Sequence, residues 1–187
     1  PLFDDTKFDG EYIALHSLVI PDTVNRLGER CFFAVREISE PVIIPASVLQ
    51  IGAYCFMSVE FSREFEEGSE LKSMDSYAFA HAKFTNVPVL PEGLERLESY
   101  AFYGTLVFAG GIVLPDTLRH IGSYAMEVKG RNSNTHPCLY IPSSVEQIEA
   151  HAFGPNGGAF VRIYTALNAE QTADFLTGWD SNAQITY

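Results

Sequence analysis

The stretch "IPASVLQIGAYCF" at Ile44–Phe56 has two close copies later in the chain, "LPDTLRHIGSYAM" at Leu114–Met126 and "IPSSVEQIEAHAF" at Ile141–Phe153. Alignment on the last residue of this stretch gives six copies, which end at Phe32, Phe56, Phe79, Phe102, Met126 and Phe153. These residues are separated by 24, 23, 23, 24 and 27 positions. Such even spacing predicts a solenoid in which each copy is one coil, covered by the coils above and below it.

The same residue types stand at the same places in each copy. Five copies open with a proline, followed at steps of three residues by Val or Leu and then by Ile or Leu. The prolines are Pro21, Pro45, Pro91, Pro115 and Pro142. A β-prone run such as "PVII" or "CLYI" precedes each proline, which cannot donate to a sheet and therefore ends the strand. A second, shorter extended piece such as "VLQIG" follows, and the "YAF" segment is short enough for a tight turn or one 3-10 turn.

The residue before the aromatic is always small, as a crowded interior position demands. It is Cys31, Cys55, Ala78, Ala101, Ala125 or Ala152. Because stacked coils lie about 4.8 Å apart, Cys31 and Cys55 are expected near each other. Two buried free thiols and a disulfide both remain open.

These copies resemble the BspA-like class of leucine-rich repeats, which read approximately L-x-x-I-x-I-P-x-S-V-x-x-I-G-x-x-A-F. The irregular third copy, "FEEGSELKSMDSYAF" at Phe65–Phe79, looks like a known form of that repeat, and the resemblance covers about Leu18–Phe153. It implies cell-surface or secreted proteins, many of them bacterial, that bind host matrix proteins or other cells.

The expected fold is of the α/β leucine-rich-repeat class and β-rich. It is a right-handed solenoid of about six 23–27-residue coils with parallel strands, short 3-10 turns and a C-terminal capping helix. We expect a single domain over 1–187, with an N-terminal cap in 1–17, repeats in 18–160, and the last strand and C-terminal cap in 161–187. In the cap, Asn168 and Gln171 predict a helix start, Phe175 and Leu176 would dock on the last coil, and Gly178 would end the helix.

The composition and motifs exclude several functions. The chain has 12 Lys and Arg against 24 Asp and Glu, and its formal charge of −12 repels nucleic acid and anionic lipids. No apolar stretch approaches the ~20 residues of a membrane-spanning helix. No nucleophile elbow, phosphate-binding loop or zinc-protease motif occurs, and the cysteines have no metal-type spacing. We therefore expect no enzyme activity, no cofactor, no metal, no nucleic acid partner and no membrane insertion.

The residues two positions before each proline are the first candidate binding surface. If their strand neighbours point inward, they form an exposed, largely apolar column. The column is Val19, Ile43, Val89, Val113 and Tyr140, with Glu64 as the approximate match in the third coil. It is either covered by a loop or by the curvature of the sheet, or it is an interface for a partner or a second copy.

A tyrosine column is the second candidate, because phenols suit recognition of protein or sugar. It consists of Tyr54, Tyr77, Tyr100 and Tyr124, with His151 at the same place in the last copy. Stacked rings that seal the edge of the core are the alternative. A third candidate is the loop Glu127–Cys138, which carries Lys129 and Arg131.

These observations favour a non-enzymatic interaction or adhesion protein whose solenoid face meets a protein partner of a host or cell surface. The alternatives are a structural or self-assembling module, and a glycan-binding or hydrolytic protein, which needs two carboxylates within about 5–10 Å of each other. The resemblance implies a secreted or cell-surface location. No leader precedes Pro1, which leaves a removed signal peptide or a trimmed chain open.

Overall fold

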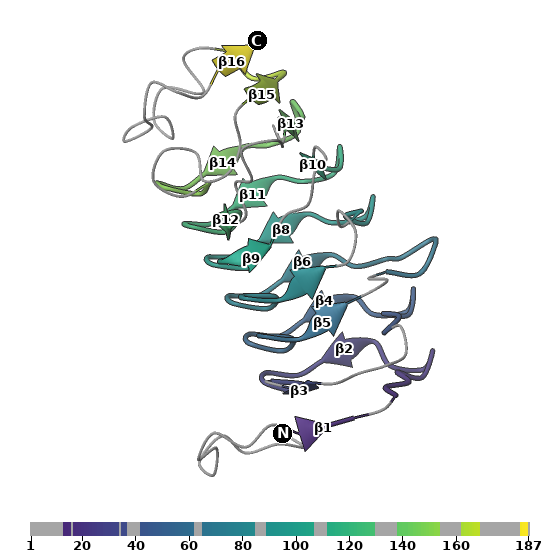
Figure 1. Ribbon diagram of the computed structural model, residues 1–187. Helices are drawn as coiled ribbons and strands as arrows, with labels where there is room; N and C mark the ends of the chain where they lie inside the picture. The colour runs from purple at the N-terminus through teal and green to yellow at the C-terminus, as the bar shows by residue number, and fades with distance from the viewer. Residues whose placement is uncertain are drawn as a thin grey trace.

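The chain winds into a stack of coils with parallel strands, as predicted (Figure 1). The computed structural model describes residues 13–15, 17–33, 35–36, 42–61, 65–84, 89–106, 112–129, 138–153, 162–168 and 184–186. No helix occurs in these residues. The two ends of the chain lie at opposite ends of the stack, so each coil contacts chiefly its two neighbours.

The longest sheet contains one strand from each of the six coils and is formed by the segment after the proline turn. Its strands are β2 (Arg26–Leu27), β4 (Gln50–Ile51), β6 (Ser73–Met74), β8 (Arg96–Leu97), β11 (His120–Ile121) and β14 (Gln147–Ile148). The register pairs the second residue of each strand with the second residue of the next. From Leu27 to Ile121 these second residues are buried, so the sheet has one apolar inner face and one outer face. We call it the six-strand sheet.

The run before the proline forms fewer strands than expected. It is a strand at β10 (Ile112–Val113) and β13 (Cys138–Ile141), which pair in register and continue into β15 (Arg162–Thr165) and β16 (Gln184–Thr186). In the earlier described coils a single bridge joins Ile44 and Phe65. Pro41 and Pro88 stand in the runs of the second and fourth coils and remove backbone donors that "GIVL" and "CLYI" retain.

A third set of strands, which the sequence analysis did not anticipate, follows the aromatic position. It comprises β5 (Glu60–Phe61), β7 (Lys83–Phe84), β9 (Thr105–Leu106) and β12 (Val128–Lys129), paired in parallel. At the N-terminal end, β1 (Ile13–Ala14) pairs with β3 (Val35–Arg36). Each strand is only two residues long, too short for an alternating pattern to appear in the sequence.

The "YAF" segment is a hydrogen-bonded turn. In the second coil the N–H of Cys55 donates to Gly52 within the coil at 3.2 Å, whereas the N–H of Phe56 donates to Ala78 of the next coil at 2.8 Å. Tyr54 has a φ of 57°, in the left-handed region. Because Tyr54 lies in the left-handed region, consecutive 3-10 hydrogen bonds do not form here. The expected 3-10 turns are therefore single turns closed by one i to i+3 hydrogen bond, and the described residues contain no 3-10 helix.

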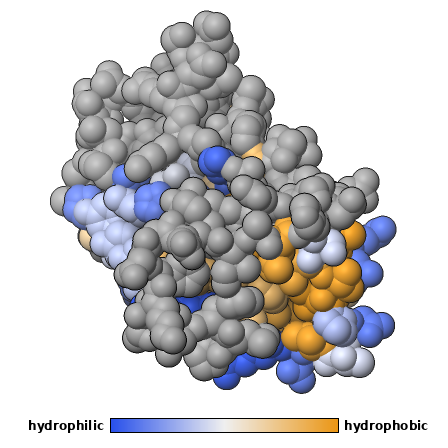
Figure 2. All heavy atoms as spheres, turned by 60° about the horizontal axis from the view of Figure 1, so that its bottom comes forward, coloured by the Kyte–Doolittle hydropathy of each residue, from blue (hydrophilic) through white to orange (hydrophobic). Residues whose placement is uncertain are grey.

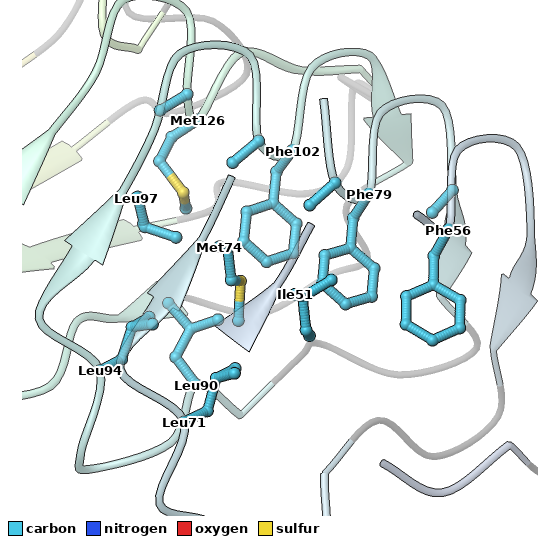
Figure 3. Close-up of a cluster of buried hydrophobic side chains, with 14 of the residues drawn as sticks. Ile51, Phe56, Leu71, Met74, Phe79, Leu90, Leu94, Leu97, Phe102 and Met126 are labelled. Atoms are coloured by element: carbon cyan, nitrogen blue, oxygen red, sulfur yellow. The ribbon is translucent and has the colours of Figure 1, made fainter. Parts of the chain in front are cut away.

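Phenylalanine rings form the centre of the core, stacked from coil to coil (Figure 3). The ring centroids of Phe56, Phe79 and Phe102 follow one another at 5.3 Å. The small residues beside them are buried from Cys55 to Ala152, which confirms the predicted crowded column. The core therefore keeps side chains of similar size in each column along the stack, and this fixes the register of the residues outside it.

Both ends of the stack fall partly outside the described residues. Strands occur at β15 and β16, where the last strand and a closing strand were expected. The predicted capping helix, with Gln171, Phe175, Leu176 and Gly178, lies outside the described residues, as does most of the predicted N-terminal cap. The domain boundaries remain predictions.

Candidate functional surfaces

An apolar column lies on the side of the stack where the chain enters the proline turns. We call this side the proline-side face. Val19 is 83%, Val89 78%, Val113 65%, Ile43 44% and Tyr140 43% exposed, and Glu64 lies outside the described residues. Figure 2 shows hydrophobic residues gathered on one side of the molecule and edged by hydrophilic ones. Neither a loop nor the curvature of the sheet covers these side chains, while their role in binding remains a prediction.

The proline-side face has a shallow groove near each end of the stack. The N-terminal groove is lined by Val19 and Ile43 together with Asp22 and Glu66. The C-terminal groove is lined by Val113, Tyr140, Tyr164 and Asp116, among others. Each groove thus combines apolar side chains with carboxylates, which suits a partner with both kinds of group.

The groove near the C-terminus owes its shape to strand pairing. The register places Val113 beside Tyr140 and Tyr140 beside Tyr164. The rings of Tyr140 and Tyr164 stack with centroids 4.9 Å apart. Tyr164, which is half-buried, therefore continues the column by one coil, and alignment on the prolines could not find it because no proline follows it at the repeat position.

The tyrosine column is a continuous stack of rings. The centroids lie 4.8 Å apart for Tyr54 and Tyr77, 4.6 Å for Tyr77 and Tyr100, 5.1 Å for Tyr100 and Tyr124, and 5.4 Å for Tyr124 and His151. All five residues have φ between 56° and 64°. At one end the guanidinium of Arg30 lies 5.1 Å from the centre of the Tyr54 ring.

This stacking limits what the tyrosine column can bind. A sugar ring or a base would need a free ring face, but each inner face is covered by the next ring. Partial burial raises the pKa of the Tyr77 hydroxyl, with help from the neighbouring phenols. The column presents ring edges and hydroxyl groups, which favours its role in joining the coils, and recognition through the hydroxyls remains a prediction.

The outer face of the six-strand sheet is polar, and two ion pairs beside its strands join neighbouring coils. Lys72 Nζ lies 3.2 Å from Glu95 Oε1, and Arg119 pairs with Glu146. Gln50 donates to the Asp75 carboxylate of the next coil at 3.0 Å. These interactions repeat because the parallel register brings side chains of the same column within reach.

A buried histidine on this sheet was missed by the sequence analysis. His120 is 5% exposed, and its Nε2 lies 3.7 Å from a carboxylate oxygen of Glu98 and 3.7 Å from one of Glu149. Gly122 carries no side chain between these two carboxylates, which belong to the coils on either side. The sequence did contain a sign of this cluster, because Glu98, Gly122 and Glu149 occupy the same repeat position in three consecutive coils.

Hydrogen bonds hold Glu149 in its charged form. The backbone N–H of Ser123 donates to it at 2.8 Å and the Ser123 hydroxyl at 3.0 Å, and Ser99 donates at 3.4 Å. The Ser123 N–H is the chief cause that lowers the pKa of Glu149, with the serine hydroxyls and His120 adding to it against partial burial.

This carboxylate pair bears on the hydrolytic alternative. Both oxygens lie 3.7 Å from the same nitrogen, so they are no further apart than twice that distance, as a pair of catalytic carboxylates requires. However, Glu98 accepts a hydrogen bond from Arg96 at 2.8 Å, and Glu149 has a lowered pKa. A general acid needs a raised pKa, so this geometry does not support hydrolysis.

The repeats match those of a known protein family. The chain matches the BspA type leucine rich repeat region in six copies over residues 4–132. The chain belongs to this family. The stack of coils continues past the matched range, because β14 (Gln147–Ile148) adds a sixth strand to the six-strand sheet. Neither the curated proteins nor the solved structures gave a match.

Membership of the BspA-type family fits a repeat module for protein interaction or adhesion. The described residues include no helix long and apolar enough to cross a membrane. Among the described residues there is also no group of three His, Cys, Asp or Glu side chains placed to hold a metal. The loop residue Arg131 lies outside the described residues.

The three cysteines of this BspA-type chain are free thiols. Burial raises the pKa of Cys55, and it also raises that of Cys31. Of the two possibilities left open by the sequence, the structure therefore shows the free pair.

Proposed function

We propose that this protein is a non-enzymatic protein-interaction or adhesion module that presents its proline-side face to a protein partner. The observation that carries the proposal is the column of exposed apolar residues, from Val19 to Tyr140. Exposed apolar residues at this position in five of the six coils make a largely apolar surface, and such surfaces mark interfaces in soluble proteins. The same face contains two grooves, at Val19 and at Tyr140.

The family supports a secreted or cell-surface setting, which we propose for this chain. BspA-type repeats are typical of surface or secreted proteins, and partners in that setting are matrix proteins or receptors. The charges of the six-strand sheet are largely paired within the chain, so that face offers fewer groups to a partner.

Self-assembly through the same face is the competing function. A second copy would bring the apolar column against itself, but it would also bring together two surfaces of the same negative charge. Glycan binding through the tyrosine column has less support, because the ring faces are covered.

The test compares two variants with the same charge change. Val89→Glu with Val113→Glu places charges in the apolar column, and Asn25→Glu with Gln147→Glu places them at exposed positions on or beside the six-strand sheet. Binding is measured on immobilised extracellular matrix proteins and on cultured cells, with circular dichroism as the control for folding. We expect loss of binding in the first variant only. Equal binding by the two variants would contradict the proposal, and wild-type dimers in sedimentation that the first variant abolishes would favour self-assembly.

A further inference from the structure

The charged residues in the described segments of the proline-side face are all acidic. Its described segments are 17–24, 42–48, 65–71, 89–94, 112–118 and 138–145, and they contain no Lys or Arg. They contain six exposed carboxylates, Asp22, Glu66, Glu67, Glu70, Glu92 and Asp116. The basic residues that directly follow two of these segments, Lys72 and Arg119, pair with Glu95 and Glu146 beside the six-strand sheet. Arg162 on β15 is the register neighbour of Cys138.

These carboxylates have no cationic partner within the described chain. None of the six forms an ion pair with a described residue, and the carboxylate of Glu66 accepts one hydrogen bond, from the N–H of Ala46 at 2.8 Å. On the six-strand sheet, by contrast, Glu95 and Glu146 each pair with a basic residue of a neighbouring coil. Negative charge on the proline-side face is therefore left without compensation by the described residues.

Carboxylates and apolar side chains meet in the same grooves. Asp22 and Glu66 line the groove that contains Val19 and Ile43, and Asp116 lines the groove that contains Val113. A Lys or Arg side chain fits such a surface, because its aliphatic stem packs on apolar groups while its charged end reaches a carboxylate. An acidic segment would meet repulsion from the same groups and from the net charge of −12.

We propose that the proline-side face binds a cationic polypeptide segment in which Lys or Arg residues alternate with apolar residues. This inference rests on the proposed function and names the chemistry of the partner. The apolar residues of the segment lie on the column from Val19 to Tyr140, and its basic residues pair with Asp22, Glu66, Glu92 and Asp116.

The size of the face sets the length of the segment. From the first to the sixth coil there are five steps of about 4.8 Å, or about 24 Å. An extended peptide advances about 3.3 Å per residue, so about eight residues span the face. Alternation places the apolar side chains on one side of the peptide and the basic side chains on the other, so the segment lies lengthwise between the apolar column and the carboxylates.

The test uses three labelled peptides of about eight residues, each alternating Val with Lys, Ser or Glu, and the full chain. Fluorescence anisotropy measures binding to the wild type, to Glu92→Gln with Asp116→Asn, and to Glu95→Gln with Glu146→Gln, which removes the same charge from the six-strand sheet. We expect the Lys peptide to bind best and to lose affinity as salt increases. Loss of the two proline-side carboxylates should weaken its binding about three- to tenfold, and the control pair should leave it unchanged.

The outcomes separate this inference from the proposed function. If the Ser peptide binds as well as the Lys peptide, and Val89→Ser with Val113→Ser weakens both, the proline-side face is the interface but the cationic partner is wrong. If the Lys peptide does not bind, or binds equally to the Glu92→Gln with Asp116→Asn variant, the inference is also overturned. If the Lys peptide binds and the valine variant leaves its binding unchanged, both the inference and the proposed face fail.

Discussion

The six-strand sheet and the proline-side face are built from the same coils, but among the described residues charged side chains pair with each other beside the sheet and remain unpaired on the proline-side face. On the sheet, Lys72 pairs with Glu95 at 3.2 Å and Arg119 pairs with Glu146. On the proline-side face, Val89 is 78% exposed and Glu92 has no ion-pair partner among the described residues. In this solenoid, side chains beside the six-strand sheet form ion pairs with neighbouring coils, while those of the proline-side face remain accessible to a partner.

The largest expected effect is a difference in the free energy of unfolding between variants of the two regions. Leu97→Ala removes a fully buried side chain from the inner face of the six-strand sheet and should lower the free energy of unfolding by about 2–5 kcal/mol. Val89→Ala, on the proline-side face, should change it by less than about 0.5 kcal/mol, because the side chain is already in water. Urea unfolding measures both. Similar losses for the two variants would contradict the assignment of Val89 to an exposed face.

The next largest effect on stability is expected for the turns that contain the tyrosine column. Tyr100 has a φ of 64° and stacks on Tyr77 and Tyr124. Tyr100→Val removes the stacking and places a β-branched residue in the left-handed region, so we expect a loss of about 2 kcal/mol. Tyr100→Asn removes the same ring but tolerates that conformation, and should lose about 1 kcal/mol. Thermal unfolding that ranks the two variants the other way would exclude backbone strain as the cause.

Acid sensitivity on the six-strand sheet should depend partly on Glu149. Its folded pKa is lowered from the ordinary value of 4.5, so its contribution is fully present above that pH and disappears as the pH falls through the folded pKa. Glu149→Gln should cost less than about 1 kcal/mol at neutral pH, and the difference from wild type should shrink at about pH 3. Urea unfolding at both pH values tests this, with Glu146→Gln as the matched control. A difference that grows in acid would contradict the sign of the shift.

The smallest expected effect is that of the exposed ion pairs. A double-mutant cycle of Lys72→Ala and Glu95→Ala should give a coupling of at most about 0.5 kcal/mol, which salt reduces, because both side chains are about half exposed. Glu92→Gln should show no coupling with Lys72→Ala. Coupling of equal size in the two cycles would mean that the charges of the proline-side face are also paired.

Much of this architecture could be predicted from columns of the repeat. The spacing of the aromatic residues gave the number of coils, and the small residues beside them gave the crowded interior at Ala78 and Ala101. The exposure of Val19 and Val113 followed from alternation along a strand. These features depend on one residue type at one place in every coil, which a single sequence displays directly.

The features that escaped prediction depend on single coils or on backbone geometry. His120 is buried between Glu98 and Glu149, an arrangement that occurs in one place only among the described coils. The left-handed conformation of Tyr54 has no sequence signal, since glycine or asparagine would be expected there. The strands after the aromatic position are two residues long and carry no periodic pattern.

The most direct test of the account is methyl NMR of the full chain with labelled valine and leucine, titrated with the Lys-containing peptide. The account predicts shifts at Val19, Val89 and Val113, while the 41% exposed Leu49, directly before the six-strand sheet, stays unchanged. Leu49 is a control for exposure, because it is an accessible apolar residue outside the proposed interface. Shifts at Leu49 without shifts at Val89 and Val113 would contradict the central claim that the proline-side face is the binding surface.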